Sequence, residues 1–236
     1  LESAVKGLEH ILNHKNHFVE GVQPKATESL ADISYLMFEQ RYRGDFSNIE
    51  KRINHYLTYF SKYNGLPVCD IGCGRGELIS SLNSNGINAY GVDMDAAMVG
   101  YANSNNLDVR LGNGLLHLAS LADDSLGGIC AIQVIEHLPW IKIEELLALA
   151  WKKLGKDGIL ILEPINPTSL LALSSNYWRD PTHVSPIHPD TLADAATKIG
   201  FSVASLDYLS EVPKISQLQP IAITEGILPS HRELIK

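Results

Sequence analysis

Residues 70–76 read D-I-G-C-G-R-G, so glycines at alternate positions follow an acidic residue. Glycine permits a positive φ and lets a ligand approach the backbone without meeting a Cβ atom. The first amide groups of the helix predicted after these glycines are donors that no helix carbonyl accepts. A second acid, Asp93, ends the next predicted strand, where a carboxylate can accept hydrogen bonds from two ribose hydroxyls. The two features together predict a binding site for a nucleotide-like ligand.

The spacing of the glycines distinguishes between nucleotide ligands. The dinucleotide pattern G-x-G-x-x-G would need a glycine where Glu77 stands, and the lysine of a P-loop is missing. The pattern D-x-G-x-G-x-G instead resembles motif I of the class I S-adenosylmethionine-dependent methyltransferases. This resemblance implies S-adenosyl-L-methionine as cofactor and S-adenosyl-L-homocysteine as product. The cofactor-binding residues on this reading are Asp70, Gly72, Cys73, Gly74, Gly76, Asp93, Met94, Asn113, Gly114 and Gln133.

Asn113 stands where this family usually has an acid that binds the adenine amine. An asparagine can still accept that amine through its amide oxygen. A turn asparagine without a ligand role is the alternative, because asparagine suits turns.

An arginine from the chain before the glycines is expected to neutralise the carboxylate of the cofactor, which the glycine turn cannot do. Residues 38–45 read F-E-Q-R-Y-R-G-D, and Arg43 is the first candidate, with Arg41 second. The alternative is a solvated helix end whose arginines oppose the helix dipole.

The fourth predicted strand ends in Q-V-I-E-H-L-P-W, residues 133–140, which resembles a segment of many small-molecule O-methyltransferases. The resemblance implies that His137 faces the acceptor pocket. In the ubiquinone-pathway O-methyltransferases the corresponding E-x-x-E-H binds a divalent metal. Because Gln133 replaces the first acid here, a metal at this segment is not favoured. The structural alternative is that Glu136 caps the next helix and His137 lines a pocket wall.

An insertion, residues 166–189, follows the fifth predicted strand and contains S-S-N-Y-W-R-D-P-T-H-V-S-P-I-H-P. Its prolines exclude one long helix, and its aromatic faces suit stacking on sugar rings. We predict a lid over the acceptor. The expected substrate-binding residues are Trp140, Tyr177, Trp178, Arg179 and His188. The alternative is a proline-rich structural loop that Asp180 caps.

The residues from Asn176 to Pro189 and the segment 38–45 both resemble elements of methyltransferases associated with bacterial surface-polysaccharide biosynthesis, including O-antigen and lipopolysaccharide. This resemblance implies methyl transfer to a hydroxyl of a sugar or glycan. A hydroxyl is a poor nucleophile, so a base in hydrogen-bond reach is expected. The catalytic candidates are two imidazoles as bases and two acids that orient them: His137, His183, Asp180 and Glu136.

Other functions remain open on the sequence. The chain can be a non-catalytic domain that binds the cofactor or its product as a scaffold or regulator of polysaccharide assembly. It can also be a small-molecule O-methyltransferase with another substrate class, and Arg179 would matter more for a phosphate or carboxylate acceptor. Nucleic acid is not expected as a partner, because the net charge is -8 and no basic cluster stands out.

The chemistry-bearing residues need a scaffold, and the alternation of apolar runs with helical patterns predicts one. We expect an α/β fold with a doubly wound, mostly parallel, seven-stranded Rossmann-like sheet. Ligands of such sheets bind at the carboxyl ends of the strands. Strands are expected at residues 66–71, 88–93, 107–111, 127–134, 159–163, 201–206 and 215–221, the last one antiparallel. Helices are expected at residues 76–84, 96–104, from 115, 143–154 and 190–200, the last one capped by Asp190.

Three parts are expected along the chain. Residues 1–63 form a helical extension and cofactor arm, residues 64–212 the core with its lid, and residues 213–236 a C-terminal strand and tail. The apolar stripe of the first helix packs on this domain or forms a dimer. Three cysteines without C-x-x-C spacing favour the cytoplasm, with peripheral attachment to the inner membrane as a variant. No apolar run approaches the ~18 residues of a membrane span.

Overall fold

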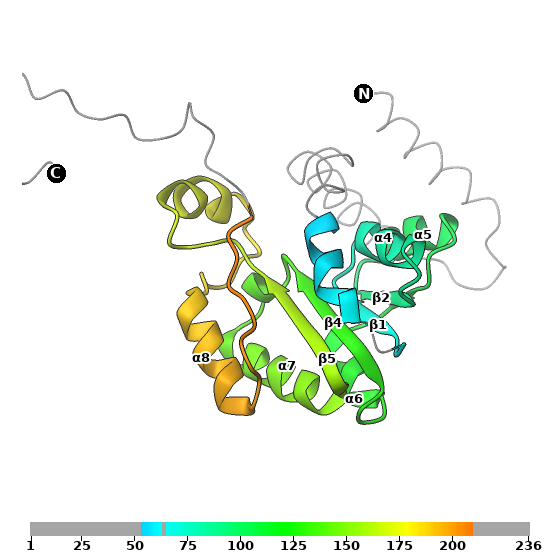
Figure 1. Cartoon of the computed structure of the whole chain (residues 1–236). Helices are drawn as coiled ribbons and strands as arrows, with labels where there is room; N and C mark the ends of the chain where they lie inside the picture. Colours follow the sequence, from blue (N-terminus) through cyan, green and yellow to red (C-terminus); the bar gives the residue numbers. More distant parts are fainter. Residues whose placement is uncertain (1–52, 63–64, 210–236) are drawn as a thin grey trace, which may run out of the picture.

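The computed structural model describes residues 53–62 and 65–209 of the chain. Its centre is one parallel sheet of five strands in the order β3-β2-β1-β4-β5 (Figure 1). The strands are β1 (Val68–Ile71), β2 (Ala89–Asp93), β3 (Val109–Leu111), β4 (Leu126–Ile132) and β5 (Leu154–Glu163). The order reverses between β1 and β4, so the switch point of a doubly wound sheet lies at their carboxyl ends.

Helices cover both faces of the sheet (Figure 1). The longer ones are α4 (Glu77–Ser84), α5 (Ala96–Ser104), α6 (Gly114–Ser120), α7 (Trp140–Lys153) and α8 (Pro189–Ile199). Short helical turns occur at η2 (Thr58–Lys62), η3 (Ile135–His137), η4 (Ala172–Asn176) and η5 (Tyr177–Arg179).

Two cores pack against the two faces because strand side chains alternate between them. Cys69, Ile71 and Ile129 face the core built with α6 and α7, and α8 packs against it. Val68 and Cys130 face the core built with α4, α5 and residues 53–60. The central strands are buried on both sides, as their continuous apolar runs predict. The α/β Rossmann-like fold is therefore confirmed.

The predicted strand at residues 201–206 is wrong. Residues 201–209 have no regular structure, and Val203, Leu206 and Tyr208 are exposed. Side chains, not a strand ladder, hold this segment: the hydroxyl of Tyr59 bonds Ser205 Oγ at 3.0 Å and donates to Asp207. The strand predicted at 215–221 lies outside the described residues.

The other predicted elements form, with shifted ends. β5 begins at Leu154, five residues earlier than predicted, and its pairing with β4 shifts register between Leu126 and Gly128. The N-cap of α8 is His188, whose Nδ1 accepts from the amide of Asp190 at 3.2 Å, so the predicted cap by Asp190 is wrong. Within the described part, none of the helices combines the length and apolar character that crossing a membrane requires.

Candidate active site

The carboxyl ends of β1 and β2 hold the two parts of the predicted cofactor site next to each other. Gly72, Gly74 and Gly76 have φ values of 64°, 54° and 82°, which residues with a Cβ rarely adopt. The amide of Gly74 donates to Asp93 Oδ2 at 2.8 Å, and the amide of Asp95 donates to Asp93 Oδ1 at 2.8 Å. The carboxylate of Asp93 therefore joins the glycine turn to the start of α5.

A side chain at position 72 has no room. An ideal Cβ on Gly72 would lie 2.5 Å from Cγ2 of Val134, a residue in the turn after β4. The glycine turn thus packs on the segment that leads to His137, and the two predicted sites are neighbours. Bare backbone at this edge fits a ligand that lies against main-chain atoms, as motif I implies.

Three large apolar side chains are exposed where β2 and β3 end and where α6 begins. The exposed fractions are 71% for Met94, 60% for Leu111 and 72% for Leu116. Leu111 is the register partner of Asp93, so this surface adjoins the carboxylate. It is suited to cover the face of an aromatic base. The sequence analysis missed Leu111 and Leu116, because an apolar residue at the end of a strand or in a helix looks like core.

Other predicted cofactor residues are buried or already bonded. Asp70 is 4% exposed and Cys73 is 3% exposed. The Cys73 side chain lies beneath Gly91, whose ideal Cβ would be 2.4 Å from Sγ, and burial raises the pKa of this thiol. Cys73 can therefore meet a ligand through its backbone and not through its sulfur.

Asn113 caps α6. Its Oδ1 accepts from the amides of Leu115 at 3.0 Å and Leu116 at 3.1 Å. These two bonds use the acceptor capacity of the amide oxygen, so the predicted contact of this oxygen with the adenine amine has no support here. This bonding agrees with the alternative interpretation, in which Asn113 has a structural role and no ligand role. Gly114 opens the helix, and an ideal Cβ there would lie 2.3 Å from Ile71 Cγ2.

The ligand set that E-x-x-E-H implies does not assemble. The amide of Gln133 donates to the carbonyl of Glu163 at 2.7 Å, and Gln133 Nε2 donates to Glu163 Oε1 at 3.3 Å. Glu136 is 1% exposed, and neither carboxylate oxygen has a hydrogen-bond partner of normal geometry among the described residues. Gln133 and Glu136 therefore do not fit as the ligands of a metal ion.

Burial raises the pKa of Glu136 from 4.5 to about 7, against an opposite effect of the nearby amides of Glu136 and Ile165. The expectation that Glu136 caps the next helix is wrong, because Pro139 is the N-cap of α7.

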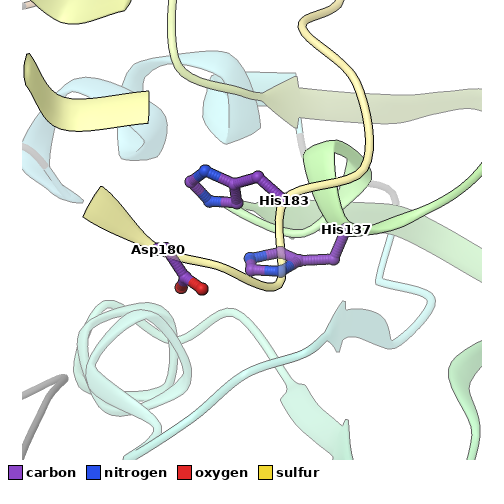
Figure 2. Close-up of side chains that lie close together, drawn as sticks. All are labelled: His137, Asp180 and His183. Carbon is purple, nitrogen blue, oxygen red and sulfur yellow. The ribbon is translucent and has the colours of Figure 1, made fainter. Parts of the chain in front are cut away.

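The two candidate bases lie side by side (Figure 2). His137 ends η3 and His183 stands in the lid, and their ring centroids are 4.6 Å apart. Asp180 belongs to the same group: one ligand atom from each of the three side chains lies within 4.8 Å of the others. The lid therefore folds back onto the segment after β4.

The imidazole rings of His137 and His183 each have a hydrogen-bond partner at Nδ1. Thr182 Oγ1 donates to Asp180 Oδ1 at 2.6 Å, so it accepts from His137 Nδ1 at 2.8 Å. His183 Nδ1 lies 2.6 Å from the carbonyl oxygen of Tyr177, which can only accept. In the neutral form of each imidazole, this bonding would place the proton on Nδ1 and a lone pair on Nε2. The sequence analysis missed Thr182, although its position two residues after Asp180 is typical of an Asx turn.

The predicted acceptor residues divide into buried and exposed ones. Tyr177, predicted to bind the substrate, is 1% exposed, and its ring centroid lies 4.7 Å from that of His183, so its ring is covered and not open to solvent. Trp178 is 67% exposed, and Arg179, also exposed, donates to Ser175 Oγ at 3.3 Å. Trp140 donates to Glu144 Oε1 at 2.9 Å, while His188 caps α8. The predicted cofactor arginine, Arg43, lies outside the described residues.

Comparisons with known proteins agree with the fold and identify the family. A family model of methyltransferase domains matches residues 42–206. A crystal structure of a SAM-dependent methyltransferase from Archaeoglobus fulgidus is 31% identical, with a TM-score of 0.74, and the match covers 85% of this chain and 89% of that one.

Two further similarities are more distant. A magnesium protoporphyrin IX methyltransferase from Synechocystis PCC 6803 with bound SAH is 21% identical, with a TM-score of 0.58, covering 78% of this chain and 92% of that one. The ubiquinone biosynthesis O-methyltransferase of Rickettsia bellii (strain OSU 85-389) is 29% identical over 126 residues, 51% of this chain and 49% of that protein. The chain spans about half the length of the curated relatives it matches.

Proposed function

Since this chain belongs to the S-adenosylmethionine-dependent methyltransferases, we propose that it methylates a hydroxyl of a sugar or glycan acceptor of polysaccharide biosynthesis. The observation that carries the proposal is the adjacent pair of imidazoles, His137 and His183, whose Nδ1 atoms bond Thr182 Oγ1 and the carbonyl of Tyr177. A hydroxyl needs such a centre, whereas a scaffold that only binds the cofactor does not.

The binding half of the mechanism belongs to the glycine turn and Asp93. Bound S-adenosylmethionine supplies a methyl group on a sulfonium leaving group. The carboxylate of Asp93 is held by the amides of Gly74 and Asp95, so it is placed to accept from the ribose hydroxyls without rearranging. Met94 and Leu111 supply apolar surface beside it for the adenine ring.

The acceptor half belongs to the lid and to the turn after β4. The exposed face of Trp178 is suited to the apolar side of a sugar ring, and Arg179 lies beside it on η5. In the metal-free protein an Nε2 lone pair would take the proton of the acceptor hydroxyl while the hydroxyl oxygen displaces sulfur from the methyl carbon, and the electron pair of the broken carbon–sulfur bond would stay on sulfur. Thr182 and the carbonyl of Tyr177 keep both rings in the required tautomer.

An acceptor of ubiquinone biosynthesis is the second candidate, because the curated relatives carry that name. Turnover assays separate the two. The purified chain is incubated with S-adenosylmethionine and nucleotide sugars, lipid-linked glycans or a prenylated phenol, and release of S-adenosylhomocysteine is measured. Release on glycans supports the proposal, release on the phenol alone supports the second candidate, and cofactor binding without release on any of them supports a scaffold.

Asp93→Asn is expected to weaken S-adenosylhomocysteine binding by about 10–100-fold, the effect of losing hydrogen bonds to a charged group. The amide would also set an N–H group against one of the two backbone donors that the carboxylate now accepts. Isothermal titration calorimetry measures the affinity. Asp190→Asn, which changes an exposed carboxylate on α8, is the matched control, and equal affinities for the two variants would remove Asp93 from the cofactor site.

A further inference from the structure

We propose that His137, Asp180 and His183 form a binding site for a divalent transition-metal ion such as Zn²⁺. One ligand atom from each side chain lies within 4.8 Å of the other two, and each residue is half-buried. Figure 2 shows the rings of His137 and His183 close together beside the Asp180 carboxylate, with an angle of 61° between the ring planes. Asp180 and His183 come from the lid and His137 from η3, so an ion here would tie the lid to the core.

The groups around the three side chains are those that orient metal ligands. Metal-binding histidines usually donate their second N–H to a carbonyl, a carboxylate or a similar oxygen, which fixes the ring and its tautomer. His183 makes this bond to the carbonyl of Tyr177. His137 makes it to Thr182, whose hydroxyl in turn donates a hydrogen bond to Asp180. In the tautomer that these bonds favour, the lone pair that a metal ion requires lies on Nε2 of each ring.

This site differs from the one that E-x-x-E-H implies. Gln133 and Glu136 do not take part, and two of the three ligands lie in the inserted segment. Two imidazoles and one carboxylate suit zinc and its first-row neighbours, whereas Mg²⁺ and Ca²⁺ prefer oxygen ligands throughout. Three protein ligands leave a coordination position for a further oxygen, as in catalytic zinc sites.

The role of the ion rests on the proposed function. An acceptor hydroxyl in the remaining position would lose its proton to water, because the ion lowers the pKa of the bound oxygen. A lone pair of that oxygen would then form the bond to the methyl carbon, and the carbon–sulfur bond would break with its electron pair left on sulfur. The products are the methyl ether, S-adenosylhomocysteine and one proton.

The test measures metal binding without cofactor or acceptor, so its result does not depend on turnover. Chelator-stripped full-length protein is titrated with Zn²⁺ by calorimetry and with Co²⁺ by visible absorption. We expect one ion per chain and the Co²⁺ spectrum of a site with nitrogen and oxygen ligands. Thr182→Val is expected to weaken binding by about 10–100-fold, and Asp180→Asn or His183→Ala by more. His55→Ala is the control, since His55 pairs with a single carboxylate, Asp207.

Wild-type protein that binds no ion, or variants that all bind as the wild type does, would overturn the site. Thr182→Val keeps all three ligands, so it decides the question if a ligand variant does not fold. Zinc binding together with turnover that is insensitive to chelator would confirm the site and overturn only its role in methyl transfer.

Discussion

His137→Ala is expected to lower kcat by about 10²–10⁴-fold, the contribution of a positioned base to proton transfer. The loss is expected whether the imidazole takes the proton itself or holds an ion, because both require Nε2 of His137. S-adenosylhomocysteine affinity should be unchanged, since His137 is not one of the residues proposed to bind the cofactor. Single-turnover kinetics with the best acceptor of the panel measures the effect.

The control for this experiment is His55→Ala, whose side chain bonds Tyr59 and Asp207. Circular dichroism at rising temperature checks that the variants fold. An unchanged kcat in His137→Ala would exclude the histidine pair from the chemistry and would favour an acceptor that needs no base, such as a phosphate.

Glu136→Gln is expected to stabilise the metal-free protein by about 3 kcal/mol at pH 8, because it removes the cost of a buried carboxylate. The pKa of Glu136 is raised from 4.5 to about 7 in the folded chain. Between pH 4.5 and about pH 7, the carboxyl group of Glu136 is ionised in the unfolded chain and still protonated in the folded chain. The free energy of unfolding of the wild type should therefore fall as pH rises through this window and level off above it.

Urea denaturation of both proteins at several pH values, with chelator present, measures the difference. The stabilities should nearly coincide at pH 4 and diverge towards pH 8. Glu144→Gln is the control, because Glu144 is an exposed acid on α7 that bonds Trp140. Parallel pH profiles for wild type and Glu136→Gln would show that the carboxyl titrates normally in the folded protein.

The glycine turn was predictable because its signal is local. Positive φ at Gly72, Gly74 and Gly76 depends on residue type and spacing, and the alternation of strands and helices determined the parallel sheet. The strand at residues 201–206 was not predictable in the same way. An edge strand needs a partner, and the same alternating pattern also allows the side-chain contacts that Tyr59 makes with this segment.

The histidine centre was predictable as a set of residue types but not as an arrangement. His137 and His183 are 46 positions apart in the chain, and the path of the lid brings them together. The path of the lid also determines contacts that the sequence pattern does not predict, such as the bond of Thr182 to His137 and the burial of Tyr177. Asn113 and Asp190 illustrate the converse, since residues that suit several turn roles do not reveal which one they take.

The division of the site between two stretches of chain has a consequence for how relatives of this protein can diverge. Residues 70–113 carry most of the described residues proposed to bind the cofactor, whereas the proposed acceptor surface lies mainly on the segment 166–189, which follows β5. Exchange of this insertion would change the acceptor while the cofactor surface stays intact. His137 limits that freedom, because a new insertion must still supply an oxygen for its Nδ1 proton. Substrate range can thus evolve through one exchangeable segment that keeps a single hydrogen bond to the core.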